Sequence, residues 1–135
     1  MIRFAQTNLK NLTQQIRRCI ITTTREGDKM FTSINTYNIY VGLNDKNTYK
    51  QEIKASEAMK KIKKIVTVEV GGATFSNAFG YWVDDLGNET KENSIVVKIV
   101  DCNDDKIESI CTKINKALNQ NCVMVEKTIS QIAFI

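Results

Sequence analysis

The stretch GGATFSNAFGYWVDDLGNETKENS, residues 71–94, decides the fold. Its first two residues, Gly71 and Gly72, end the helical pattern that precedes the stretch. Residues 73–84 alternate as a strand does, and the segment 84–88 is turn-like. A second strand pattern follows at 93–101. Two such patterns joined by a short turn containing Asp, Gly and Asn predict a β-hairpin.

Two elements are expected before the hairpin. Residues 36–43 place apolar side chains at every second position, which is typical of a half-buried strand. Ser56 is the expected cap of a helix whose apolar residues recur at helical spacing. Four lysines at positions 60, 61, 63 and 64 lie mostly outside that apolar stripe and indicate a solvated face.

The elements after the hairpin complete a recognisable order. Asp104 is the expected cap of another helix, with apolar residues at helical spacing up to Leu118, and a β-rich tail covers 122–135. From residue 36 the order is β-α-β-β-α-β. It predicts an α+β, ferredoxin-like fold in which two helices cover one face of an antiparallel sheet.

The first thirty residues are expected to form a segment separate from this fold. Residues 7–20 carry an amphipathic helical pattern, so we expect an N-terminal helical extension at 1–30 and an α+β ligand-binding core at 31–135. A chain of 135 residues suits a single domain overall. The extension or a second subunit could cover the open face of the sheet.

Composition excludes several classes of protein. The net charge of +4 is weak for a binder of duplex nucleic acid, and neither a membrane span nor an export signal is present, so we expect a cytoplasmic protein. The absence of His and of CxxC pairs excludes the usual zinc sites and Cys/His nucleophiles. Cys19 and Cys111 fall on helical apolar stripes and are expected in the core. No cofactor is expected.

Alternation divides the aromatic residues of segment 73–84 between two faces. Phe75, Phe79 and Tyr81 share one face with Asn77, whereas Trp82 lies on the other face. One interpretation places the first three aromatic rings in the core under the helices, with Trp82 partly exposed. The other uses one or two of these rings as a platform for a flat ligand.

Polar residues around the hairpin favour a nucleotide as that ligand. Stacking a base on an aromatic ring contributes about 1–3 kcal/mol. Asn77, Asn93 and Thr74 provide amide and hydroxyl groups, and Gly72 permits close approach of the backbone to a phosphate.

Two alternatives stay open. An RNA-recognition domain has the same element order, but its third strand carries aromatic residues, and segment 93–101 has none. A small nucleotide-processing enzyme could use acidic residues near the turn, including Glu92, for Mg²⁺ or for acid and base chemistry. Acidic residues in a turn are more often simply solvated, so we expect neither a metal site nor catalysis.

Four short segments, Tyr40-Val41-Gly42-Leu43-Asn44-Asp45, Gly71-Gly72-Ala73-Thr74, Gly80-Tyr81-Trp82 and Glu92-Asn93-Ser94, resemble the first family of Thoeris anti-defence proteins. The resemblance covers about residues 36–127. It implies a phage protein that sequesters signalling nucleotides without cleaving them. These would be cyclic ADP-ribose isomers made by TIR-domain enzymes, and in some members cyclic oligonucleotides of the CBASS pathway.

The resemblance also implies a homo-oligomer, dimeric or higher, with ligand pockets at subunit interfaces. By position, Tyr81 or Trp82 together with Asn93 would contact the ligand. The arginines that face phosphate in this family have no counterpart in the core, which leaves Arg17 and Arg18 as candidates. The full set of candidate ligand-binding residues is Tyr81, Trp82, Asn93, Asn77, Phe79, Thr74, Gly72, Glu92, Arg17 and Arg18.

Overall fold

The computed structural model describes residues 30–135. The expected helix at 7–20, with Arg17, Arg18 and Cys19, lies outside the described residues. The described elements, in chain order, are β1 (Thr32–Gly42), α2 (Ala55–Val70), β2 (Thr74–Val83), β3 (Glu89–Val100), α3 (Asp104–Ala117) and β4 (Met124–Ile132).

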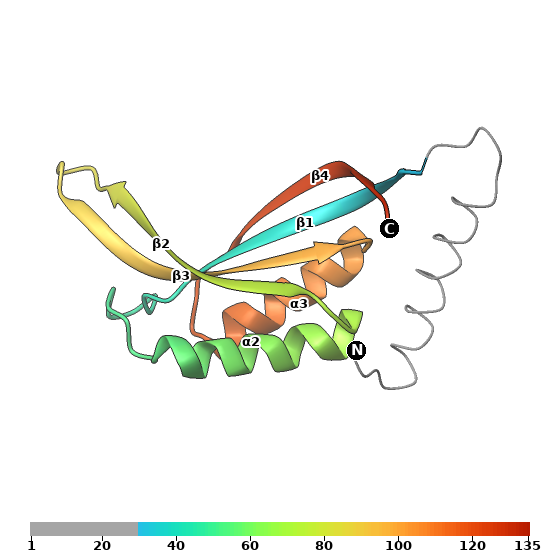
Figure 1. Cartoon of the computed structure of the whole chain (residues 1–135). Coiled ribbons are helices and arrows are strands. Elements are labelled where there is room, and N and C mark those ends of the chain that lie inside the picture. Colours follow the sequence, from blue (N-terminus) through green and yellow to red (C-terminus); the bar gives the residue numbers. More distant parts are fainter. Residues whose placement is uncertain (1–29) are drawn as a thin grey trace.

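Within residues 30–135, the strands form one four-stranded sheet in the order β2-β3-β1-β4. Every neighbouring pair is antiparallel. Both helices lie on the same face of this sheet, and the opposite face carries no element of the described chain (Figure 1). The expected α+β, ferredoxin-like β-α-β-β-α-β fold is therefore confirmed.

The core lies between the sheet and the two helices. Alternate side chains of β1 and β3 point toward the helices and are buried, and three apolar residues on each helix meet them. Burying each isoleucine or valine side chain of this set contributes about 1.5–3 kcal/mol. The buried residues include Ile39, Val41, Ile95, Val97, Ala58, Ile62, Val66, Ile107, Ile110 and Ile114.

Cys111 packs against this core, as expected. Burial raises the pKa of its thiol to about 11, so the group stays protonated and unreactive at neutral pH. In the described part of the chain Cys102, Cys111 and Cys122 are all free thiols.

Both helices begin earlier than expected, α2 by two residues and α3 by one. Lys54 is the N-cap residue of α2 and makes no capping bond with its side chain, so Ser56 lies inside the helix and the expectation that it is the cap was wrong. The N-cap of α3 is Asn103, whose side chain accepts a hydrogen bond from the Lys106 amide. Asp104 instead accepts a 2.6 Å hydrogen bond from the Tyr37 hydroxyl.

The hairpin of β2 and β3 is longer than expected, because β3 begins at Glu89 and not at residue 93. Its outer half projects past the ends of the helices (Figure 1). Phe75 packs against the core, but Phe79 and Tyr81 are each 59% exposed. Placing all three rings in the core was therefore wrong for the outer two, because no helix reaches them.

Neither helix in the described residues is long and apolar enough to cross a membrane.

Candidate functional site

The antiparallel order brings three connections together at one end of the sheet. These are the loop after β1, the turn between β2 and β3, and the loop before β4. They enclose a groove of about 680 Å³. Its lining residues are Asn44, Asp45, Lys46, Tyr49, Trp82, Asp84, Thr90, Glu92, Gln120, Asn121 and Cys122.

The projecting hairpin supplies the floor of the groove. Trp82 pairs with Thr90, and Glu92 pairs with Gly80. The side chains of Trp82, Thr90 and Glu92 therefore lie on the face of the sheet away from the helices. The Trp82 side chain is 51% exposed. Its ring is therefore available for contact with a flat ligand.

Asp45 organises the loop wall. Its Oδ1 accepts hydrogen bonds from the amides of Asn47, at 2.8 Å, and Thr48, at 3.2 Å. Its Oδ2 accepts a 2.7 Å bond from Asn119 Nδ2. The bond from Asn119 and those from the two amides lower the pKa of the Asp45 carboxyl, which stays ionised at neutral pH.

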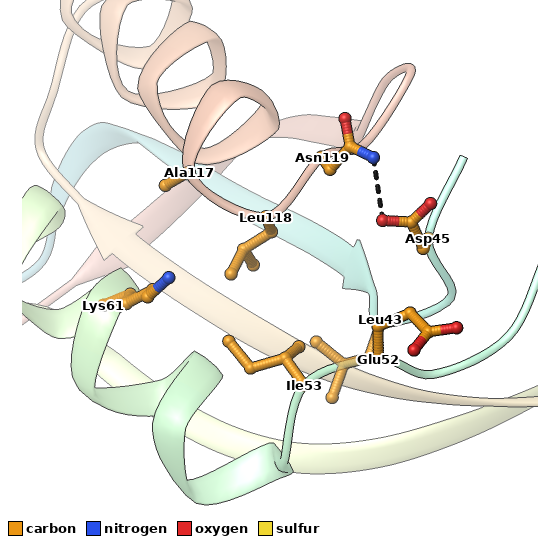
Figure 2. A pocket seen from close by; sticks show the side chains of 8 residues that line it. All are labelled: Leu43, Asp45, Glu52, Ile53, Lys61, Ala117, Leu118 and Asn119. Atoms are coloured by element: carbon orange, nitrogen blue, oxygen red, sulfur yellow. Dashed lines mark hydrogen bonds between the residues drawn. The ribbon is translucent and has the colours of Figure 1, made fainter. Parts of the chain in front are cut away.

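A smaller pocket of about 310 Å³ lies behind this wall, next to the helices. Figure 2 shows Leu43, Ile53 and Leu118 around its centre, with the Asp45–Asn119 bond at its rim. Asp45 lines both the pocket and the groove. The bonded loops thus form a partition between the two hollows.

Glu92 differs from the other acidic residues of the groove. Its side chain is partly buried, its carboxylate lies against Gly42 of β1, and no hydrogen bond or ion pair to another residue of 30–135 satisfies it. Burial raises the pKa of this carboxyl above its ordinary value. A partly buried carboxylate without a protein partner attracts a cation more strongly than a fully solvated one does.

The charges around the groove are mostly negative. Of its described lining residues, Asp45, Asp84 and Glu92 are acidic and Lys46 is basic. Bonds from the Asn88 amide and side chain, and from the Leu86 amide, keep the pKa of Asp84 low. This arrangement suits a ligand that carries positive charge and opposes one that carries a pyrophosphate.

The groove contains two of the expected ligand-binding residues, Trp82 and Glu92. Tyr81, Phe79, Asn77 and Asn93 lie on the opposite, helix-side face. They are in phase with Ile95 and Val97, whose side chains point toward the helices. Asn93 donates a 2.9 Å bond to Gln51 Oε1 beneath the hairpin. Of the two expected combinations, Trp82 and Asn93 lie on different faces, whereas Tyr81 and Asn93 share the helix-side face, outside the groove.

Two further candidates lie far from the groove. Thr74 begins β2 at the opposite end from Trp82, and Gly72 precedes it. Arg17 and Arg18 fall outside the described residues.

The exposed rings on the helix-side face of the hairpin form a small cluster of their own. Phe79 and Tyr81 meet edge to face with centroids 5.8 Å apart, and Lys91 Nζ lies 4.6 Å from the centre of the Phe79 ring. These contacts shield part of each ring from water, although no core residues lie beneath the two rings.

The loop residues of the groove were not predicted from the sequence; chief among them are Asn44, Lys46, Tyr49 and Gln120. The element order contained the necessary signal. In an antiparallel β-α-β-β-α-β sheet, the loops after the first strand and before the last strand lie beside the turn of the hairpin.

Two observations concern the metal and RNA-binding alternatives. The described residues contain no cluster of three or more His, Cys, Asp or Glu side chains that could hold a metal ion. Along β3, the open face presents Ser94, Val96 and Lys98, with no aromatic ring for a base to stack on.

No family model and no curated protein matches this chain. Solved structures share its fold. A phage SAM lyase in complex with S-methyl-5'-thioadenosine superposes with a TM-score of 0.55 at 19% identity, covering 75% of this chain and 90% of that chain. A phage SAM lyase in the apo state gives a TM-score of 0.56 at 19% identity, with 76% and 90% covered. The B. subtilis GlnK–ATP complex reaches a TM-score of only 0.38 at 11% identity, over 71% and 83% of the two chains.

Proposed function

We propose that this protein is a lyase that binds S-adenosylmethionine and cleaves it to S-methyl-5'-thioadenosine. The observation that carries the proposal is the unpaired, partly buried carboxylate of Glu92 in a groove with three acidic residues and one lysine. S-adenosylmethionine carries a positive sulfonium and a positive ammonium group, which such a groove attracts. The shared fold with a phage SAM lyase supports the same conclusion.

Each part of this ligand has a matching group in the groove. The Trp82 ring suits the adenine base, because stacking depends on a flat exposed surface. Glu92 suits the sulfonium or ammonium group. The side chains of Asn44, Thr90 and Gln120 offer hydrogen bonds to the ribose hydroxyls.

The proposed reaction needs little from the protein beyond positioning. Formation of S-methyl-5'-thioadenosine breaks the bond between sulfur and Cγ of the methionine part, and the electron pair stays on sulfur, which becomes neutral. If the substrate's own carboxylate attacks Cγ, homoserine lactone forms without a proton transfer. A chain that contains no His can support this step, because holding the two reacting groups in line lowers the barrier.

A second balanced route uses Glu92 as a base. Glu92 would remove a proton from Cβ, a double bond would form between Cβ and Cγ, and the products would be 2-aminobut-3-enoate and S-methyl-5'-thioadenosine. The raised pKa of Glu92 improves it as a proton acceptor. The identity of the amino-acid product distinguishes the two routes.

Sequestration without cleavage is our second proposal, as the Thoeris resemblance implies. Trp82 and the amide side chains of Asn44, Gln120 and Asn121 could hold cyclic ADP-ribose isomers or cyclic oligonucleotides intact. The negative lining opposes their phosphates, with Lys46 as the described cation in the groove. Either activity would remove an adenosine-containing molecule from the cytoplasm of the infected cell.

A homo-oligomer is part of both proposals. Phe79, Tyr81 and Val83 are exposed together on the helix-side face of the hairpin, and a second subunit that covered them would remove this apolar surface from water. Native mass spectrometry of the full chain would show a dimer or larger assembly. A monomer at micromolar concentration would contradict this part of the proposal.

Incubation with S-adenosylmethionine, followed by liquid chromatography and mass spectrometry, tests the first proposal. We expect the wild-type protein to form S-methyl-5'-thioadenosine. In Glu92→Gln the rate of its formation should fall by more than about tenfold. Glu126→Gln is the matched control, because Glu126 shares the open face but bonds to Asn38 outside the groove. Intact S-adenosylmethionine after incubation would contradict the lyase.

The second proposal has its own arm in the same experiment. Cyclic ADP-ribose isomers and cyclic dinucleotides are mixed with the protein, the unbound fraction is measured, and the complex is heat-denatured. Depletion followed by recovery of the unchanged nucleotide would support sequestration. Failure to bind any of these cyclic nucleotides would contradict sequestration.

A further inference from the structure

Glu92 lies between two glycines on the open face of the sheet. Gly80 is directly opposite it on β2. On the other side of β3, Gly42 pairs with Ser94, the next residue on the same face. Toward each neighbouring strand, the Glu92 side chain therefore faces a glycine, whose missing side chain leaves free space.

The carboxylate occupies only one of these two spaces. A Cβ added at Gly42 would come within 1.7 Å of Glu92 Oε1 and 2.7 Å of Cδ, which no real contact permits. A Cβ added at Gly80 would meet nothing within 4 Å. Glu92 thus leans toward β1 and the loop wall of the groove, away from β2.

The backbone conformation at position 42 does not require a glycine. Among the described residues, Gly71 and Gly87 have positive φ angles, whereas Gly42 has an ordinary strand conformation. Glycine in the interior of a strand is less stable than alanine there, and it often marks a place where another group approaches closely. Here the approaching group is a carboxylate that has no other partner within residues 30–135.

We propose that Gly42 is a positioning residue, whose missing side chain leaves the space that holds the Glu92 carboxylate against β1 at the floor of the groove. Contact with β1 shields one side of the carboxylate from water and leaves the other side toward the ligand. The other charged groups that line the groove are Asp45, Lys46 and Asp84. The inference rests on the proposed function only for its activity readout.

Gly42→Ala and Gly80→Ala form a matched pair that tests this. In Gly42→Ala, the added methyl must push the carboxylate into solvent. We expect the pKa of Glu92, followed by the ¹³C shift of its carboxyl carbon, to fall toward the ordinary value for glutamate. Gly80→Ala should leave it unchanged.

The same two variants have distinct expected kinetics. A displaced carboxylate should lower kcat/KM for S-adenosylmethionine by about 100-fold in Gly42→Ala, with weaker substrate binding. Gly80→Ala should keep the wild-type values. Thermal denaturation checks folding, and neither variant should melt earlier, because alanine is tolerated in strands better than glycine.

A double variant separates positioning from damage to the sheet. If Gly42 acts through Glu92, Gly42→Ala should have no further effect on ligand binding in a Glu92→Gln background. Equal carboxyl titration in Gly42→Ala and Gly80→Ala would overturn the inference. Because this titration needs no ligand, it decides the role of Gly42 even if the protein proves unable to cleave S-adenosylmethionine.

Discussion

Asn119 donates a 2.7 Å hydrogen bond from Nδ2 to Asp45 Oδ2, joining the loop before β4 to the loop after β1. The backbone strengthens this link, since the Lys46 amide donates to the Asn119 carbonyl at 3.1 Å. Asn119 also has a φ of 51°, a conformation that asparagine tolerates better than most residues. One residue therefore ends the last turn after α3 and holds the wall of the groove.

Replacing Asn119 separates these two contributions. Asn119→Ala loses the side-chain bond and keeps a β-carbon in the left-handed region, which alanine tolerates less well than asparagine. Asn119→Gly loses the same bond but also removes the β-carbon, so glycine adopts this conformation without strain. We expect the alanine variant to be less stable than the glycine variant by about 1 kcal/mol in urea denaturation. Equal stability of the two variants would show that the conformation at this position contributes nothing.

Glu92→Gln should make the protein more stable at neutral pH although it removes the proposed ligand contact. Burial raises the folded-state pKa of Glu92, so folding favours the protonated form. The associated stability is present below the unfolded pKa and is lost as pH rises through the folded pKa. Because solvent still reaches the side chain, we expect a gain below about 1 kcal/mol at pH 7 in urea denaturation.

The pH at which this gain appears is a second test of the same variant. Wild type and Glu92→Gln should be equally stable at a pH below the ordinary pKa of glutamate and should diverge as pH rises above it. A constant difference across this range would mean that the carboxyl does not titrate as proposed.

Binding of S-adenosylmethionine should weaken on acidification. The cation requires ionised Glu92, and the raised pKa of this carboxyl means that ionisation is lost at a higher pH than for an ordinary glutamate. Isothermal titration calorimetry between neutral and mildly acidic pH measures the effect. In Glu92→Gln the residual affinity should lose this dependence, because the titrating group is gone.

Trp82→Ala and Phe79→Ala distinguish the two faces of the hairpin. Loss of the stacking ring in Trp82→Ala should weaken binding of an adenosine ligand by about 1–3 kcal/mol, or about 5-fold to 150-fold in Kd. Phe79 is exposed to a similar extent on the opposite face, so its removal should leave Kd unchanged. A loss of affinity in Phe79→Ala alone would move the site to the helix side.

Most of the fold could be predicted because each element repeats its apolar residues at a clear period. The alternation in β1 correctly identified the face that Ile39 and Val41 bury. In β2 the same rule correctly separated Trp82 from Phe79. Periodicity fixes the side toward which a residue points but not the length of the helix beneath it, and so the exposure of Phe79 could not be predicted.

The site was only partly predictable for a different reason. Trp82 and Glu92 stand out by residue type within one hairpin, but Lys46 and Gln120 are ordinary loop residues until the fold brings them together. The hydrogen bond that Asn93 donates to Gln51 depends on the path of a loop that has no periodic pattern. Element order could have indicated which loops meet, but not which side chains face the ligand.

The projection of the hairpin beyond the helices (Figure 1) allows the proposed ligand site to change independently of the core. Its open face is supported mainly by the pairing of two strands, and neither Trp82 nor Thr90 belongs to the buried core cluster, so substitutions there leave the core packing intact. A lineage of such proteins could therefore alter what this groove recognises while keeping its stability. In the laboratory, a library confined to these positions would explore ligand preference with few unfolded members.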